Sequence, residues 1–234
     1  VDRIILRIFP SGRPPRHCTI HDLHTVTDPE QKITTYAYDP LGRVTTVQDH
    51  LSQTTAYAYD AAGHLRSLTD AKSQTSGFAY TGLGRVEQER RPMGESTSYT
   101  YNESGKLETK TDARGQRTEY VYEASTNLLT DIYYFDDSDT QTGHVTFTYE
   151  RGQLSGYDDG EISASYEYNA FGQKLSETVT YPSASLGAGP GFSKTFSYSY
   201  DNSGRKRNFS LPDGVTYSYT YEDNELRNIR VPGV

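Results

Sequence analysis

The sequence predicts an all-β protein, built as a long antiparallel ribbon of β-hairpins with two strands in each 21-residue repeat. Three observations support this fold class. A tyrosine motif recurs at a fixed period, which is typical of repeat architectures. The two tyrosines of each motif are two residues apart, as are residues on one face of a strand. Turn-forming Asp and Gly residues follow each tyrosine pair, and no segment has helical periodicity.

The repeat reads Tyr-x-Tyr-Asp-x-x-Gly-x-Leu, with variations. In the first five copies the second tyrosines are 21 residues apart, and the fifth copy lacks the Asp and the Gly. The pattern resumes at 147–154, and three less regular copies follow. Five regular and three less regular copies give eight, and therefore roughly sixteen strands. The motif residues are Tyr36, Tyr38, Asp39, Gly42, Tyr57, Tyr59, Asp60, Gly63, Phe78, Tyr80, Gly84, Tyr99, Tyr101, Gly105, Tyr120, Tyr122, Tyr166, Tyr168, Gly172, Tyr198, Tyr200, Asp201, Gly204, Tyr219 and Tyr221.

The second copy shows how one repeat is expected to fold. Residues 53–59 form a strand, and Asp60 to Gly63 form a type I turn closed by a glycine bulge. An Asp at the first turn position hydrogen-bonds to nearby backbone, and Gly at the fourth tolerates positive φ. The chain returns along 65–68, and a second turn follows at 70–74. Because every connection is a tight hairpin, the sheet is expected to be antiparallel and to follow chain order.

Composition excludes several functional classes. The net charge is −8 and no basic stripe occurs, so a nucleic-acid partner is not expected. The single cysteine, Cys18, cannot form an intrachain disulfide. No run of apolar residues is long enough to span a membrane. We expect no cofactor.

Two groups of residues have side chains that could bind a metal ion or catalyse a reaction. Cys18, His21 and His24 have the side chains of metal ligands, but no second ligand pair stands at a zinc spacing, so we predict solvated histidines and no metal site. The carboxylates that could pair for general acid–base catalysis are Asp136, Asp137, Asp139, Asp158 and Asp159. Acidic runs are usually solvated loops, and no P-loop, dinucleotide or Gly-x-Ser-x-Gly motif occurs. No catalytic residue is therefore predicted.

We interpret residues 1–234 as a single β domain that is a fragment of a larger protein. Residues 1–27 are an irregular lead-in, in which 3–9 have the composition of a strand. Residues 28–135 hold five regular repeats. Residues 136–234 hold three less regular ones, interrupted by a Gly/Pro-rich loop at 181–192 that we expect to be exposed between strands.

The repeat resembles the YD repeat of the Rhs family over about residues 28–226. That family includes bacterial Rhs polymorphic toxins, the C components of insecticidal toxin complexes, wall-associated proteins and, more distantly, teneurins. The resemblance implies a ribbon that coils into a spiral β-shell around a C-terminal toxin. It also implies a secreted or delivered location, with the remaining shell and the enclosed toxin as partners. The plug region and self-cleavage site found after the repeats in many members have no counterpart here, so self-cleavage is carried over to no residue.

Three functions follow as hypotheses. The first is a non-catalytic structural segment of an encapsulating shell. The second is a carbohydrate or cell-surface binding module, to which the absence of tryptophan is unfavourable. The third, an enzyme, has the least support. Exposed strand edges also invite pairing with another chain, so self-association is expected.

Overall fold

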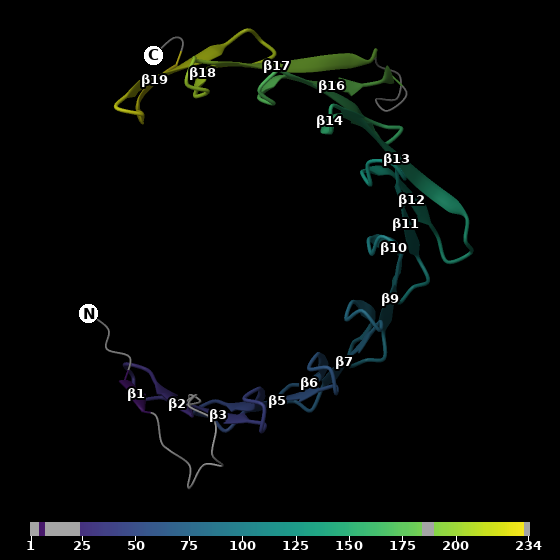
Figure 1. Cartoon of the computed structure of the whole chain (residues 1–234), viewed down its shortest axis with the longest axis vertical. Coiled ribbons are helices and arrows are strands. Elements are labelled where there is room, and N and C mark those ends of the chain that lie inside the picture. Colours follow the sequence, from purple (N-terminus) through teal and green to yellow (C-terminus); the bar gives the residue numbers. More distant parts are fainter. Residues whose placement is uncertain (1–4, 8–23, 184–189, 232–234) are drawn as a thin grey trace. The chain divides into compact units, whose positions relative to one another are not determined.

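The computed structural model describes residues 5–7, 24–183 and 190–231, and these ranges contain strands, turns and no α-helix. Contacts divide the chain into two compact units, Val1–Gly105 with Lys110–Ala113, and Lys106–Thr109 with Arg114–Val234. In each unit the strands form an antiparallel ribbon (Figure 1). This confirms the predicted fold class, while a single domain over 1–234 stays a prediction.

The first unit contains nine complete strands, each paired with the next along the chain. They are β1 (Ile5–Arg7), β2 (Thr25–Thr27), β3 (Ile33–Tyr38), β4 (Val44–Gln48), β5 (Thr54–Tyr59), β6 (Leu65–Thr69), β7 (Thr75–Tyr80), β8 (Val86–Arg90) and β9 (Ser96–Tyr101). Strand β10 (Leu107–Thr111) lies where the two units divide.

The second unit continues the same order, again with each strand antiparallel to the next. Its strands are β11 (Arg117–Tyr122), β12 (Leu129–Phe135), β13 (Gln141–Glu150), β14 (Gln153–Asp158), β15 (Ser163–Tyr168), β16 (Lys174–Tyr181), β17 (Phe192–Tyr200), β18 (Lys206–Ser210), β19 (Thr216–Glu222) and β20 (Glu225–Arg230). The predicted connection at 181–192 does join two strands, and its residues 184–189 lie outside the described ranges.

The predicted turn is present between β5 and β6. The Gly63 amide donates to the Asp60 carbonyl at 3.1 Å, and Gly63 has φ +94°. One carboxylate oxygen of Asp60 accepts from the amides of Ala62 and His64 at 2.9 and 2.8 Å. Gly105 has φ +77° at the equivalent place in the fourth repeat. Asp and Gly therefore occupy this turn for the reasons that the sequence suggested, and the turn prediction is confirmed.

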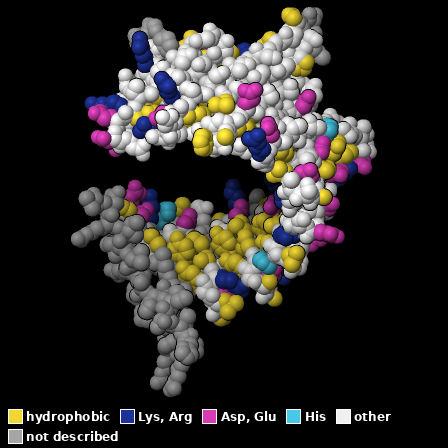
Figure 2. Space-filling model, turned by 45° about the horizontal axis from the view of Figure 1, so that its top comes forward, with side chains coloured by type: hydrophobic (Ala, Val, Ile, Leu, Met, Phe, Trp, Pro, Cys, Tyr) yellow, Lys and Arg dark blue, Asp and Glu magenta, His cyan; other side chains and the backbone are white. Residues whose placement is uncertain are grey.

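The tyrosines occupy the more covered face of the ribbon. In β3, Tyr36 and Tyr38 are half-buried, whereas Ala37 between them is exposed. The residues opposite the first tyrosines are often apolar, as in the pairs Tyr36–Val47 and Tyr57–Leu68. Figure 2 shows a patch of hydrophobic side chains on the visible face of the molecule.

Burial is slight throughout, because each ribbon is one sheet thick. Ala164, at 6% exposure, is the only hydrophobic residue that is fully buried among those described. Hydrophobic burial in a deep core therefore contributes little, and the ribbon depends on contacts between neighbouring strands and repeats, as in other linear repeat proteins.

The described residues form twenty strands, so the expectation of roughly sixteen was too low. Two of the additional strands, β1 and β2, lie in the predicted irregular lead-in. The other two, β13 and β14, are a ninth hairpin that contains Phe147 and Tyr149. The acidic stretch after Leu128 is no interruption either, because 129–135 form β12 and Asp136 begins the turn that follows. The motif at 147–154 was recognised but left out of the count, whereas β1 and β2 have three residues each and contain no tyrosine motif.

Candidate functional site: the contacts between successive repeats

In seven hairpins the second tyrosine of the motif bonds to the hairpin before it. The Tyr59 hydroxyl donates to the Val44 carbonyl at 2.9 Å, and the Tyr80 hydroxyl donates to the Leu65 carbonyl at 2.9 Å. The same bond, at 2.7 to 3.0 Å, is made by Tyr101, Tyr122, Tyr149, Tyr200 and Tyr221. The hydroxyl at this position therefore joins neighbouring hairpins.

The accepting carbonyl lies at an irregularity of the sheet. The register shifts between Ala37 and Tyr38, so that Tyr38 pairs with Val44, the residue whose carbonyl accepts from Tyr59. An equivalent shift precedes the second tyrosine in the other hairpins whose register is known. A bulge disrupts the ladder locally, which makes a backbone carbonyl available to another donor.

A basic side chain covers the ring of the same tyrosine. The Arg43 guanidinium lies 4.5 Å from the centroid of the Tyr59 ring, and the Arg205 guanidinium lies 4.6 Å from that of Tyr221. Arg85 lies over Tyr101 at 5.5 Å and Lys106 over Tyr122 at 4.9 Å in the same way. Cation–π contacts at partly exposed sites contribute about 0.5–1 kcal/mol each. The residue directly after the motif glycine thus stabilises the junction with the next repeat.

Sequence reasoning gave this position no role, although a signal was present. Basic or histidine residues follow the motif glycine at positions 43, 64, 85, 106 and 205. Nothing in the sequence indicated that these side chains lie against the tyrosine of the following repeat, because that contact joins residues about sixteen positions apart.

Besides allowing positive φ, the motif glycine lies close to the side chain that follows the glycine of the preceding repeat. A β-carbon at Gly84 would lie 2.8 Å from Nε2 of His64, and one at Gly105 would clash with the Arg85 guanidinium. A β-carbon at Gly63 would lie 3.5 Å from the Arg43 guanidinium. The turn of one repeat therefore packs against the basic side chain of the repeat before it.

The motif aspartate holds the basic residue in place. Asp39 accepts from Nε of Arg43 at 2.7 Å, and its carboxylate lies 2.6 Å from Nη2 of the same residue. Asp201 and Arg205 are arranged alike, at 2.8 Å for both contacts. Hydrogen bonds from the Arg43 backbone and side chain lower the pKa of Asp39, and those from the Arg205 side chain and backbone lower the pKa of Asp201.

These pKa shifts predict a loss of stability in acid. A carboxyl group whose pKa is lower in the folded state stabilises the fold above its unfolded pKa of about 3.9, and this contribution is lost as the pH falls through the lowered value. An Asp39→Asn variant, which places the residue native at Asn102 and Asn169 in this turn, should show a weaker acid dependence of the urea midpoint than the unchanged chain. Equal acid dependence in both would contradict the role given to Asp39.

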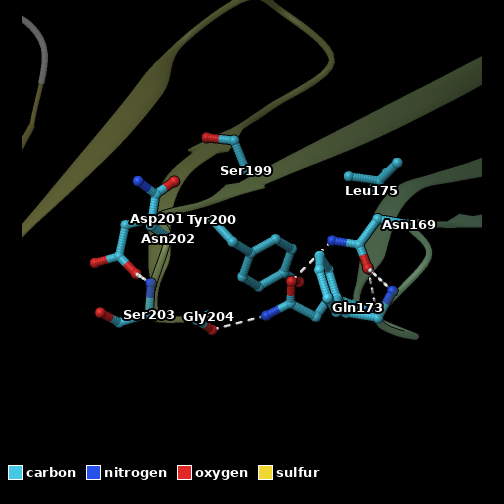
Figure 3. A pocket seen from close by; sticks show the side chains of 10 residues that line it. Asn169, Gln173, Leu175, Ser199, Tyr200, Asp201, Asn202, Ser203 and Gly204 are labelled. Atoms are coloured by element: carbon cyan, nitrogen blue, oxygen red, sulfur yellow. Dashed lines mark hydrogen bonds between the residues drawn. The ribbon is translucent and has the colours of Figure 1, made fainter.

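A shallow recess between two neighbouring turns of the second unit shows the junction in another form (Figure 3). Gln173 stands where other repeats have a cation, and its Nε2 donates to the Gly204 carbonyl at 2.8 Å. Its Oε1 accepts from Nδ2 of Asn169 at 2.8 Å, while the Tyr200 hydroxyl donates to the Lys174 carbonyl at 2.9 Å. The hydrogen bond from Gln173 to Gly204 therefore joins the two turns in place of a cation–π contact.

The first tyrosine of the motif packs differently. Phe78 replaces it in the third repeat, so this position does not require a hydroxyl. In the second unit, Tyr198 stacks on Phe209 with ring centroids 5.2 Å apart, and Phe209 stacks on Tyr217 at 6.1 Å. These rings cover one another's faces, and such pairs add about 0.5–1.5 kcal/mol to the burial of their surface.

The tyrosines are suited to donate hydrogen bonds. Burial, followed by the charges of Asp60 and Glu89, raises the pKa of Tyr80. Burial likewise raises the pKa of Tyr122, and the nearby Tyr120 adds to this effect. Both side chains therefore keep their protons at neutral pH and act as donors to backbone carbonyls.

The other candidate residues do not come together as a site. Asp136 accepts from the amides of Ser138 and Thr140, both at 2.9 Å, and Asp158 and Asp159 accept from the turn amides that follow them. Asp139 bonds to Arg117, and Asp137 lies beside Gly115. Asp136, Asp158 and Asp159 thus accept hydrogen bonds within turns, and Asp139 forms an ion pair.

Of the three residues with metal-ligand side chains, Cys18, His21 and His24, the described residues include His24 alone. Cys18 and His21 lie outside them, whereas the His24 ring lies edge-on to Tyr38 with ring centroids 6.0 Å apart. Over 5–7, 24–183 and 190–231, no group of three or more His, Cys, Asp or Glu residues is placed to hold a metal ion. No helix in these ranges has the length and hydropathy needed to cross a membrane.

Comparison with known families explains the periodicity. The model of the RHS repeat matches residues 20–50, 59–95 and 80–117, which include the first four tyrosine motifs almost completely. Residues 20–50 and 59–117 contain RHS repeats. The resemblance drawn from the tyrosine motif is therefore confirmed. No curated protein matches the chain.

Several solved structures resemble this chain. The TcdB2-TccC3 complex without its hypervariable C-terminal region matches with a TM-score of 0.70 and 18% identity, over 90% of this chain and 13% of that one. The complex of TcdB2-TccC3 with Cdc42 and the Tc holotoxin pore of Photorhabdus luminescens each match with a TM-score of 0.66 and 18% identity, over 86% of this chain and 12% of theirs. At this identity the similarity establishes the fold, and the chain spans about an eighth of those relatives.

Proposed function

We propose that this chain is a non-catalytic structural segment of a hollow RHS-repeat shell that encloses a C-terminal toxin or effector. The observation that carries the proposal is the chain of contacts between repeats. In it the Asp, the Gly, the basic residue and the second tyrosine all serve to fix one hairpin to the next. These residues are occupied by contacts between repeats and not by a catalytic site. A wall built from repeats requires such contacts in each unit.

The thinness of each ribbon supports the same role. A sheet with almost no buried core cannot hold a substrate in a deep pocket, but it can separate two compartments. Its likeness to part of the TccC3-containing complexes is in keeping with a place in the wall of a toxin complex. The partners would then be the rest of the shell and the enclosed polypeptide, and the protein would be secreted or delivered to target cells.

The alternative, a carbohydrate or cell-surface binding module, has less support from the geometry. A sugar ring stacks on an exposed aromatic face, and here cations or other rings cover several of these faces. The experiment below distinguishes the two functions.

The test uses the natural full-length parent. It is purified under native conditions, treated with protease and analysed by mass spectrometry, with a denatured sample as the control. A shell predicts a C-terminal polypeptide that is cleaved from the repeats, retained with them and protected until denaturation. A parent with no retained polypeptide and an accessible interior would reject encapsulation and favour surface binding.

A further inference from the structure

One junction between repeats has a titratable residue where the others have a permanent charge or a neutral amide. Arg43, Arg85, Lys106 and Arg205 lie over the tyrosine of the next repeat. Between the second and third repeats the same place is taken by His64. Histidine is the side chain whose ordinary titration falls near pH 6.5, whereas Arg and Lys remain charged at any physiological pH.

The contacts of His64 match those of the arginines. Its Nδ1 lies 3.0 Å from Oδ2 of Asp60, as an arginine in this position lies against its aspartate. Its ring stacks on Tyr80 with centroids 4.6 Å apart and an interplanar angle of 25°. Its Nε2 faces Gly84 in the turn of the next repeat. The ring is therefore held between its own turn and the following hairpin.

Protonation changes what this arrangement contributes. A neutral imidazole offers Asp60 one hydrogen bond and Tyr80 an uncharged ring. A protonated one offers an ion pair and a cation over the tyrosine face. We propose that His64 makes the junction between the second and third repeats pH-sensitive, so that acidification strengthens the contact between these two hairpins. This inference does not depend on the enclosed toxin.

The charged groups near His64 come from its own turn, from β8 and from the preceding junction. Asp60 lies in the same turn, and Glu89 on β8 acts on Tyr80 beneath the ring. Arg43 has the opposite charge, and its guanidinium approaches Gly63 in the preceding junction. The direct contact is with Asp60, and the His64 side chain is 34% exposed, so the effect is expected to be modest.

The second unit contains a comparable arrangement. Nε2 of His144 lies 2.9 Å from Oδ1 of Asp131, and its ring stacks on Tyr133 with centroids 4.2 Å apart and an angle of 6°. This contact joins β12 and β13 within the sheet. The two histidines report on different units, so His64 can be tested without interference from His144.

The experiment measures amide hydrogen exchange in β5 to β8 of the whole chain at about pH 5.5 and about pH 8, corrected for the intrinsic effect of pH on exchange. A local readout is needed because repeat proteins open in parts. We expect local opening to be about two- to five-fold rarer at the lower pH. His64→Arg should remove this dependence, because a permanent charge keeps the junction closed at both pH values. His64→Gln should also remove it, but without the added protection from exchange at the lower pH.

Two further variants make the test specific. His50→Gln removes an exposed turn histidine of the same unit and should leave the dependence unchanged. Arg43→His should create a new dependence around Tyr59, because this turn retains its aspartate, Asp39, and it covers the case in which a His64 variant folds poorly. The proposal is overturned if His64→Arg keeps the dependence of the unchanged chain, or if Arg43→His creates none.

Discussion

Replacing Gly105 by valine is expected to destabilise the first unit by about 2–3 kcal/mol. Gly105 has φ +77°, a conformation that costs a residue with a β-carbon about 1–2 kcal/mol and a β-branched residue more. The new side chain would also displace the Arg85 guanidinium from its place over the Tyr101 ring, 5.5 Å from the centroid. The urea dependence of the far-ultraviolet circular dichroism measures the loss.

Gly94→Val is the matched control for this prediction. Gly94 has φ +88° in a turn of the same unit, but no other atom lies within 4 Å of the place that its β-carbon would take. Gly94→Val should therefore lose the stability that backbone strain costs, but no cation–π contact. If both variants lose the same stability, the motif glycine is needed for φ alone. In an Arg85→Ala background the additional cost at Gly105 should disappear.

A Tyr59→Phe variant is expected to lose about 1 kcal/mol, because removing the hydroxyl takes a hydrogen bond from the Val44 carbonyl at the register shift. The ring and its contact with Arg43 remain, so the change isolates the bond between the first and second repeats. Urea unfolding, together with hydrogen exchange in β4 and β5, measures the overall loss and locates it.

Tyr57→Phe in the same strand serves as the comparison. Phe78 occupies the equivalent position of the third repeat, so loss of this hydroxyl should change stability by less than about 0.5 kcal/mol. Equal losses at Tyr57 and Tyr59 would show that the second tyrosine has no special role in joining repeats.

The regular repeats could be predicted closely because their signals are local. Period-2 tyrosines, Asp at the start of a turn and Gly at its end act within one hairpin, and the observed turn from Asp60 to Gly63 follows from them. The prediction failed where spacing changed. Phe147 and Tyr149 lie in a ninth hairpin with strands of ten and six residues, whose motif at 147–154 was recognised but not counted as a copy because it breaks the 21-residue period.

The contacts between repeats were less accessible to sequence reasoning. The hydroxyl of Tyr200 reaches Lys174, 26 residues away, whereas that of Tyr59 reaches Val44 over fifteen. A fixed period cannot reveal a contact whose separation in sequence changes with the length of an inserted loop. The bulge before each second tyrosine was missed as well, because a one-residue register shift follows from how both strands pair and has no residue signature of its own here.

The sequence by itself determined an antiparallel ribbon of tyrosine-bearing hairpins, their order and the residues of their turns, since these depend on side-chain alternation and local backbone preference. Only the tertiary structure decided which face the tyrosines cover, and that Arg43, His64 and Arg85 connect each repeat to the next. The physical reason is that these contacts form between hairpins. A basic residue after a glycine appears in sequence as a solvated side chain until the next tyrosine is placed beneath it.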